Sequence, residues 1–323
     1  MIGFPSDWLG QVVSTGIFEP LNGYKPTTSA EDPRFLKALS VNNKLYAFPL
    51  TAEALALVYN KALVPSPPAT WSEFLKVAQA NTTSSRSGFL YDIDNPYYNY
   101  GFVKAYGGYI FREKENGFDV NDIGLATPGA LKAAQFVSDF QQRHRLIPAG
   151  ITDARAKAAF LEGRLAFWLA GPWEIGDILT AGIDVGVTTF PTPPQAIQPW
   201  TPIVTISGVA VTSVSPQKAL AVQFAQQLSV RAAQINLYQV SGRIPASPGA
   251  RQALKNDPIV AGFSAALRAG TALPTIPEID QVWEPWATAS SQLLSQPPEQ
   301  ARQILNDLVQ RIRTRIKGSS QGK

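Results

Sequence analysis

The segment Lys44-Leu-Tyr-Ala-Phe-Pro-Leu-Thr-Ala-Glu-Ala-Leu-Ala-Leu-Val-Tyr-Asn-Lys61 contains two apolar runs, residues 45–50 and 54–59. Each run has the length and composition of a buried strand. Glu53 lies between them, and a carboxylate there is destabilising unless it is paired. Two interpretations of Glu53 stay open at this point. It ends a strand and is held by a backbone donor, or it contacts a ligand.

Signals for helices and further strands follow this segment. Residues 70–73 (Thr-Trp-Ser-Glu) have the pattern of a capping box, and residues 127–128 (Thr-Pro) place an N-cap before a proline. Residues 165–170 and 207–212 are predicted strands, and the last helix is predicted to begin near Pro298. Strands that alternate with capped helices indicate an α/β fold in which helices cover both faces of the sheets.

Length and charge limit the classes of function. The 323 residues are enough for two domains, because a single core stops growing at roughly 250–300 residues. The net charge of +4 comes from scattered Lys and Arg, without the basic patch of a nucleic-acid-binding protein. No apolar run reaches the roughly 18–20 residues that a membrane-spanning helix needs. We therefore predict a soluble body and no nucleic-acid partner.

The residues that many catalytic mechanisms use are missing from the sequence. The chain has no Cys, and its one His, His144, lies in a polar segment typical of the protein surface. No GxSxG elbow and no GxGxxG or GxxxxGK[ST] phosphate loop occurs. These absences argue against thiol and Ser-His nucleophiles, Cys-ligated zinc and nucleotide chemistry, and we predict no cofactor and no metal. Acid-base chemistry by paired carboxylates stays open.

Aromatic residues are abundant, with 7 Trp, 10 Tyr and 16 Phe. Several of them stand beside Gly, Pro and single carboxylates, which is typical of a binding cleft. Flat aromatic faces stack on the C–H faces of sugar rings, while Asp, Glu and Asn bind the hydroxyl groups at the ring edge. The composition therefore favours a carbohydrate ligand.

Several segments in the same order resemble bacterial maltose/maltodextrin-binding proteins. These proteins are the extracellular solute-binding proteins of ABC sugar importers, and the similarity covers nearly the whole chain. One such segment alone would be a weak signal, but five in order are specific. They are residues 44–61, residues 95–98 (Asn-Pro-Tyr-Tyr) with 106–109 (Tyr-Gly-Gly-Tyr), residues 158–166 (Ala-Ala-Phe-Leu-Glu-Gly-Arg-Leu-Ala), residues 171–173 (Gly-Pro-Trp), and residues 273–277 (Leu-Pro-Thr-Ile-Pro) before Trp283.

The resemblance implies an α/β, type II periplasmic-binding-protein fold with two lobes, a hinge and a ligand cleft between the lobes. Relatives have a signal sequence and a first βαβ segment before the residues that match Met1–Phe4. We therefore expect a truncated first lobe here, through a misassigned start or a deletion. The implied boundaries are 1–51 and 207–255 for the N-terminal lobe, 56–202 and 260–323 for the C-terminal lobe, and 52–55 and 203–206 for the hinge crossings.

The resemblance also implies polar substrate-binding residues. Asp7 and Glu53 match carboxylates that accept hydrogen bonds from sugar hydroxyls. Asn95 stands where relatives have Glu, so a neutral side chain would bind the hydroxyl. Leu273 replaces a Met beside the cleft, and Ala287 replaces an Arg. These departures leave the exact sugar open.

Five aromatic residues complete the implied substrate site. Tyr97, Trp173 and Trp283 match residues that stack on sugar rings, and Trp8 stands where relatives have Arg or an aromatic. Tyr98 is either a second contact or packing behind Tyr97. The alternative for the two tryptophans is an ordinary place in the core.

By this resemblance, the chain is a solute-binding protein that captures maltose or maltodextrin-type oligosaccharides for an ABC importer, and it is not an enzyme. Its expected partners are the sugar and the membrane permease subunits. A monomer is expected in the periplasm or another extracytoplasmic place, with lipid anchoring left open. Three alternatives remain: a binder of another small glucoside such as trehalose or sucrose, a glycoside hydrolase that uses Asp7 and Glu53, and a truncated remnant without transport function.

Overall fold

The computed structural model of the protein describes residues 1–21, 32–115 and 117–321, so expectations for residues 22–31, 116 and 322–323 lie outside the described part. Within that part, no helix is both long and apolar enough to cross a membrane. The chain forms two compact units. Unit 1 comprises Met1–Leu55, Gly171–Thr180 and Ile203–Pro277, and unit 2 comprises Ala56–Ala170, Ala181–Pro202 and Glu278–Lys323.

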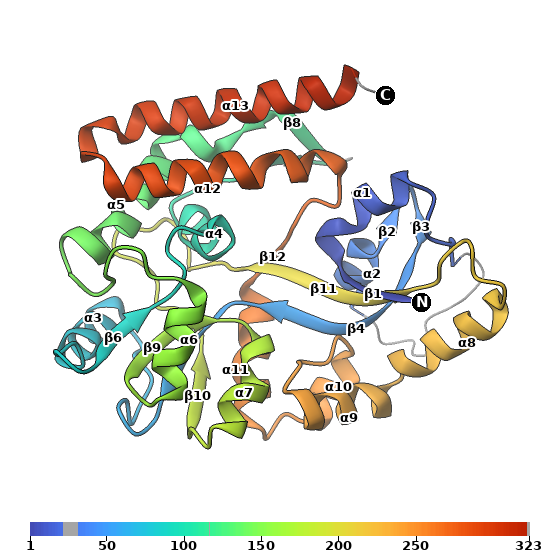
Figure 1. Ribbon diagram of the computed structural model, residues 1–323, viewed down its shortest axis with the longest axis horizontal. Helices are drawn as coiled ribbons and strands as arrows, with labels where there is room; N and C mark the ends of the chain where they lie inside the picture. Colours follow the sequence, from blue (N-terminus) through green and yellow to red (C-terminus); the bar gives the residue numbers. More distant parts are fainter. Residues whose placement is uncertain (22–31, 116, 322–323) are drawn as a thin grey trace. The chain divides into compact units, whose positions relative to one another are not determined.

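The sheet of unit 1 is built around strand β11 (Ile203–Ala210). This strand pairs antiparallel with β4 (Ala47–Ala54) and β1 (Ile2–Pro5), and parallel with the short β12 (Thr271–Ala272). Figure 1 shows β4 and β11 running side by side. Every residue of β4 except Leu50 is buried, so both faces of this strand are covered. The predicted strand at residues 45–50 overlaps β4 only from Ala47 onward, because Leu45 belongs to β3.

Helices α8 (Lys218–Ser229) and α11 (Pro258–Ala269) pack against β4. Phe48 of β4 belongs to a buried cluster with Val222 and Ala225 of α8. Burial of these apolar side chains fixes α8 on the sheet. The other elements of unit 1 are η1 (Ser6–Trp8), α1 (Leu9–Ser14), α2 (Pro33–Ala38), β2 (Ser40–Val41), β3 (Lys44–Leu45), η3 (Pro172–Glu174), α7 (Ile175–Thr180), α9 (Arg231–Ser241) and α10 (Pro248–Ala253).

The sheet of unit 2 has the strand order β10-β5-β9-β6. Strands β5 (Ala56–Asn60) and β9 (Leu165–Ala170) are buried along their whole length and pair antiparallel. β10 (Val185–Thr188) pairs antiparallel with β5, and β6 (Ser87–Leu90) pairs parallel with β9. The prediction of a strand at residues 165–170 is therefore confirmed.

Helices of unit 2 begin where the sequence signals predict. Thr70 and Glu73 form the capping box at the start of α3 (Trp71–Ala80), and Thr127 accepts a hydrogen bond from the Ala130 N–H at the start of α5 (Pro128–Gln142). These caps satisfy backbone donors that the first helical turn leaves unpaired. The other elements are α4 (Pro96–Ala105), β7 (Phe111–Lys114), β8 (Gly117–Ile123), η2 (Gly124–Ala126), α6 (Asp153–Leu161), η4 (Pro277–Ile279), which begins at the unit boundary, α12 (Asp280–Ser295), η5 (Pro298–Gln300) and α13 (Ala301–Gln321).

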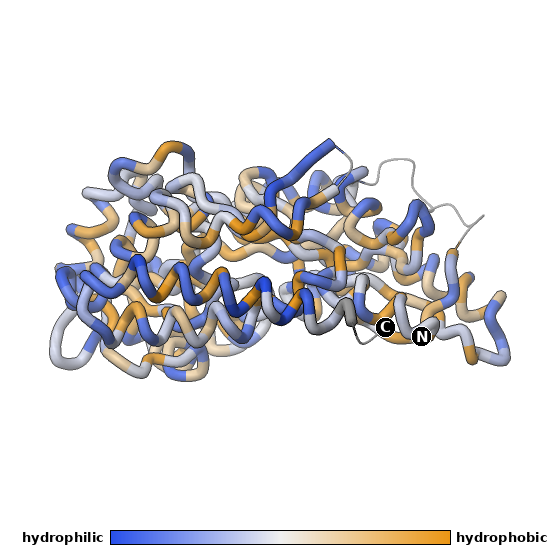
Figure 2. The backbone as a smooth tube through the Cα atoms, turned by 90° about the horizontal axis from the view of Figure 1, so that it is seen from above, coloured by the Kyte–Doolittle hydropathy of each residue, from blue (hydrophilic) through white to orange (hydrophobic). Residues whose placement is uncertain are grey.

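The last two long helices, α12 and α13, lie side by side (Figure 1). In Figure 2, hydrophilic and hydrophobic residues alternate along the helix that ends at the C-terminus. Ile304, Leu308, Ile312 and Ile316 recur every fourth residue along α13, and all four are buried. This spacing places them on one helix face, as the sequence predicts for the final helix.

Unit boundaries differ from the lobe boundaries expected from the resemblance. Residues 171–180 group with unit 1, although they lie within the expected C-terminal-lobe range of 56–202. Close packing explains this grouping, because a Cβ at Gly176 would lie 2.9 Å from the Ser241 carbonyl oxygen. Residues 260–277 also group with unit 1, since α11 packs on β4 and β12 pairs with β11.

Candidate functional site

Glu53 is the centre of a polar cluster in unit 1. It lies inside β4, and its side chain is only 10 % exposed. Its Oε1 accepts hydrogen bonds from Arg243 Nη1 at 2.9 Å and Ser207 Oγ at 3.1 Å, and the Thr51 hydroxyl lies at 3.5 Å. A buried carboxylate is tolerated when donors of this kind satisfy it. Glu53 is the last residue but one of β4, and its donors are side chains, so the expectation of a backbone donor is wrong.

The two carboxylate oxygens of Glu53 differ in the number of hydrogen bonds that they accept. All three donors meet at Oε1, and no hydrogen bond to Oε2 is formed within the described ranges. A carboxylate oxygen accepts more than one hydrogen bond. The cluster therefore fixes the orientation of the carboxylate and leaves acceptor capacity at Oε2.

Arg243 reaches Glu53 because α9 ends just before it. Gly242 has a φ of 71°, the left-handed conformation that closes a helix and turns the chain. A Cβ at this position would also lie 2.8 Å from Ile175 and 2.9 Å from the Gly176 nitrogen. Glycine allows both the left-handed backbone and the close approach of Ile175 and Gly176. Gly242 therefore sets the direction of the chain after α9 and so the position of Arg243.

Trp173 lies in η3, directly after β9 ends. Its indole packs over Gly171 so closely that a Cβ at position 171 would clash with the ring. Trp173 is partly exposed, and η3 packs against β4, the strand of Glu53. The Gly-Pro-Trp segment thus holds a flat aromatic face close to the protein surface.

Asp7 and Trp8 lie in the short turn η1 after β1. This turn packs against β11, where the Ile206 N–H donates to the Ser6 hydroxyl at 3.2 Å. Asp7 is partly buried, while Trp8 is 56 % exposed. The structure therefore places all four predicted residues of unit 1 on the β4–β11 pair or on elements that pack against it.

In unit 2, Asn95 is the N-cap of α4. Its Oδ1 accepts from the Tyr97 N–H at 3.0 Å, and its Nδ2 donates to Asp92 Oδ2 at 3.2 Å. The amide group is thus engaged inside the protein at both ends. Its observed role is to begin α4 and to hold Tyr97 in the first turn.

Tyr97 and Tyr98 differ in exposure. Tyr97 is partly exposed, and its ring stands edge-on to Tyr98 with 6.1 Å between centroids. Tyr98 is 5 % exposed, stacks on Tyr91 and donates its hydroxyl to Asp153 Oδ1 at 3.0 Å. Burial raises the pKa of Tyr98, so its hydroxyl stays protonated as a donor. This environment favours the packing interpretation of Tyr98.

Trp283 lies on α12, which packs against α4. Its ring is partly exposed and parallel to that of Trp286, with 6.4 Å between centroids and 2° between planes. Trp286 is buried and supports Trp283 from within the unit. The structure therefore brings together the two helices that carry the predicted aromatic residues of unit 2.

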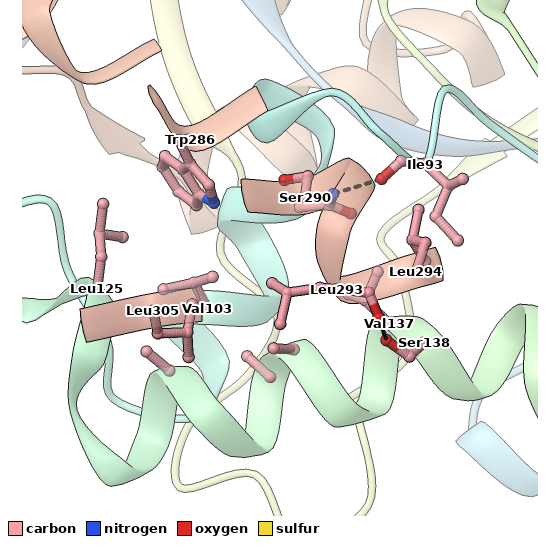
Figure 3. A pocket seen from close by; sticks show the side chains of 14 residues that line it. Ile93, Val103, Leu125, Val137, Ser138, Trp286, Ser290, Leu293, Leu294 and Leu305 are labelled. Carbon is pink, nitrogen blue, oxygen red and sulfur yellow. Dashed lines mark hydrogen bonds between the residues drawn. The ribbon is translucent and has the colours of Figure 1, made fainter. Parts of the chain in front are cut away.

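Trp286 also lines an apolar cavity between helices of unit 2. Figure 3 shows Trp286 at one end of the cavity, with Leu293 and Leu305 among the side chains around it. The Ser138 hydroxyl in the wall donates to the Leu293 carbonyl oxygen at 3.2 Å. This side-chain donor is thus satisfied within the protein, and the cavity is a feature of the core.

Sequence reasoning missed the residues that surround Glu53. Arg243 is 190 positions away from it and Ser207 is 154. Ser207 lies in a predicted strand, but no local pattern joins any of these residues to the carboxylate. In the described part of the chain, no group of three or more His, Cys, Asp or Glu side chains is arranged to hold a metal ion.

Comparison with solved structures assigns the fold. A Thermus thermophilus maltotriose-binding protein bound with maltotriose has a TM-score of 0.93 and 37 % identity, covering 98 % of this chain and 84 % of that chain. Two curated relatives are a galactooligosaccharide-binding protein of Bacillus subtilis and a maltooligosaccharide ABC transporter solute-binding lipoprotein of Streptococcus pneumoniae. Their identities are 27 % and 28 %, and the alignments cover 100 % and 97 % of this chain and 78 % and 75 % of the relatives. The fold class is therefore the two-lobed α/β fold of sugar-binding proteins, as expected.

The family model described as bacterial extracellular solute-binding protein matches residues 1–262. The chain belongs to this family, and the expected resemblance is confirmed. The family consists of solute-binding proteins of transporters.

Proposed function

We propose that the chain captures maltose or maltodextrin-type oligosaccharides and delivers them to an ABC importer without modifying them. The observation that carries this proposal is the similarity, over 98 % of the chain, to a protein bound with maltotriose. The environment of Glu53 supports it, because three donors orient an acceptor that retains capacity at Oε2.

The candidate residues divide into direct contacts and supports. Asp7 and Glu53 accept hydrogen bonds from sugar hydroxyls. Tyr97, Trp173 and Trp283 offer partly exposed aromatic faces to the sugar rings, and the exposed ring of Trp8 adds a further face. Asn95 and Tyr98 support Tyr97, because their polar groups are engaged within the protein.

Titration calorimetry of the full chain with maltotriose tests this proposal. We expect saturable heat for one site per chain and no free glucose or maltose after prolonged incubation. Release of sugar would favour the glycoside hydrolase alternative, which uses Asp7 and Glu53. A folded chain that gives no heat with maltotriose would contradict maltodextrin binding.

A second sugar class is a specific alternative. The galactooligosaccharide-binding relative aligns with the whole of this chain. Titrations with galactooligosaccharides, trehalose and sucrose under the same conditions separate these ligands. Binding of any of them at least about tenfold tighter than maltotriose would assign the site to that sugar instead.

The proposed partners and location follow from the family and its relatives. The chain acts as a monomer outside the cytoplasmic membrane and presents its sugar to the permease subunits of an importer. The streptococcal relative is described as an ABC transporter lipoprotein, which supports both an importer partner and a lipid anchor. Co-purification with its own permease in the presence of sugar tests the partnership.

Asn95→Ala tests the support role of Asn95. Loss of the cap is expected to lower the free energy of unfolding by about 1 kcal/mol. Because Asn95 also holds the Tyr97 backbone, maltotriose affinity is expected to fall severalfold. Urea unfolding and calorimetry measure the two effects.

Thr127→Ala is the matched control, since Thr127 caps α5 in the same unit. It is expected to lose similar stability and to keep the sugar affinity. Equal affinities for the Asn95→Ala variant and the original chain would remove Asn95 from the support of the site.

A further inference from the structure

A cationic pocket in unit 1 is lined by none of the residues proposed to bind sugar. Helices α2, α10 and α11, with the residues that flank them, form its walls, and no candidate sugar contact lines it. Four of its side chains are cations and one is a carboxylate. The polar side chains that matter for its chemistry are Asp32, Arg34, Arg251, Lys255, Ser264 and Arg268.

The charges in this pocket are unbalanced. Asp32 is paired with Arg34 through a contact of 2.8 Å between Asp32 Oδ2 and Arg34 Nη2. The hydrogen bond from Arg34 holds the pKa of Asp32 below its usual value, so this carboxylate stays ionised and engaged. Neither Lys255 nor Arg268 forms an ion pair with any carboxylate of the described chain. Lys255 and Arg268 therefore bring positive charge to the pocket that no carboxylate of the described residues pairs with.

Arg251 is fixed in place within the pocket. Its Nη1 donates to the carbonyl oxygens of Pro245 at 2.7 Å and Ala246 at 2.5 Å. Its guanidinium also lies over the ring of Phe35, 5.5 Å from the centroid. A guanidinium held in this way binds an anion with little loss of side-chain entropy.

A buried hydroxyl adds a second, independent sign of a ligand. Ser264 is 9 % exposed and lines the pocket, yet its Oγ has no hydrogen-bond partner in the described structure. Serine in a helix commonly bonds back to a carbonyl of the preceding turn, and buried polar atoms are nearly always satisfied. A ligand oxygen in the pocket would supply the missing partner.

We propose that this pocket binds a phosphate group, either as a free anion or as the headgroup of an anionic lipid. Arg251, Lys255 and Arg268 provide charge, and the Ser264 hydroxyl donates a hydrogen bond to one of the phosphate oxygens. Guanidinium and ammonium groups are the usual partners of phosphate in proteins. This binding is separate from sugar capture and does not depend on the proposed sugar specificity.

Titration of the full chain with inorganic phosphate, at constant ionic strength set with sodium chloride, tests the proposal. We expect saturable binding that Arg268→Gln weakens about tenfold, as expected for a lost hydrogen bond to a charged group. Ser264→Ala is expected to weaken it severalfold. Lys44→Gln, which removes an exposed cation elsewhere in unit 1, is the matched control and is expected to leave affinity within about twofold.

Two results would overturn the proposal. One is the absence of saturable phosphate binding, and the other is an equal loss in the Lys44→Gln and Arg268→Gln variants, which would indicate general electrostatic attraction. Maltotriose titration of each variant checks the fold independently.

Vesicle sedimentation then separates the two sources of phosphate. Binding to phosphatidylglycerol-containing vesicles but not to pure phosphatidylcholine, abolished by Arg268→Gln, would support a lipid headgroup. Saturable binding of inorganic phosphate with no vesicle binding would support a free anion.

Discussion

Trp173→Ala is expected to weaken maltotriose binding at least about tenfold. Trp173 is partly exposed on η3, beside the strand that carries Glu53, and is proposed to stack on a sugar ring. Burial of an aromatic face of this size contributes on the order of 1–3 kcal/mol, and about 1.4 kcal/mol corresponds to a tenfold change. Titration calorimetry gives the affinity, and the change in tryptophan fluorescence on binding is expected to decrease as well.

Three variants make this test specific. Trp173→Phe keeps a flat face and is expected to retain part of the affinity. Gly171→Ala leaves the indole present but displaces it, because the new Cβ would clash with the ring, so affinity is also expected to fall. Phe224→Ala removes an exposed aromatic of α8 in the same unit and is expected to change nothing. An unchanged affinity in Trp173→Ala would exclude Trp173 from the site.

Local signals in the sequence predict much of the fold. The run at residues 165–170 is strand β9, the capping box at residues 70–73 begins α3, and the Thr-Pro pair at residues 127–128 begins α5. These features depend only on residues that are close together in the sequence. A local pattern of residue types is therefore enough to predict them. The predicted strand limits differ from the observed ones, since Glu53 lies inside β4 although the pattern places it between two strands.

Long-range partners are not visible in local patterns. Arg243 and Glu53 meet because β4 lies beside the turn after α9, and that proximity is a result of tertiary packing. Residues 171–180 group with unit 1 for the same reason. An aligned family indicates which positions are important, but only the packed structure shows which donor faces which oxygen.

Side-chain function is equally hidden from residue type alone. The residue type of Asn95 suggests a binder of hydroxyl groups, yet its Oδ1 caps α4 and its Nδ2 donates to Asp92. Tyr97 and Tyr98 are adjacent and chemically identical, but one is partly exposed and the other buried. A helix turns about 100° per residue, so adjacent side chains face different surroundings.

Glu53→Gln is expected to weaken maltotriose binding by roughly ten- to a hundredfold, since hydrogen bonds to charged groups contribute about 1.5–3 kcal/mol. The amide keeps the size of the side chain but removes the charge and replaces one acceptor oxygen with a donor nitrogen. Arg243→Met removes the charged donor that orients the carboxylate and leaves Ser207 and Thr51 as donors. This variant is expected to weaken binding less than Glu53→Gln does, because the acceptor remains.

A double-mutant cycle shows whether Arg243 contacts the sugar itself or only orients the Glu53 carboxylate. If Arg243 acts through Glu53, the Glu53→Gln/Arg243→Met pair loses no more affinity than Glu53→Gln alone. Glu19→Gln is the control, since Glu19 pairs with Lys218 at 2.8 Å in the same unit and is not a candidate contact. Additive losses in the cycle would mean that Arg243 binds sugar itself. Full affinity in Glu53→Gln would show that the buried cluster serves only to join β4, β11 and the end of α9.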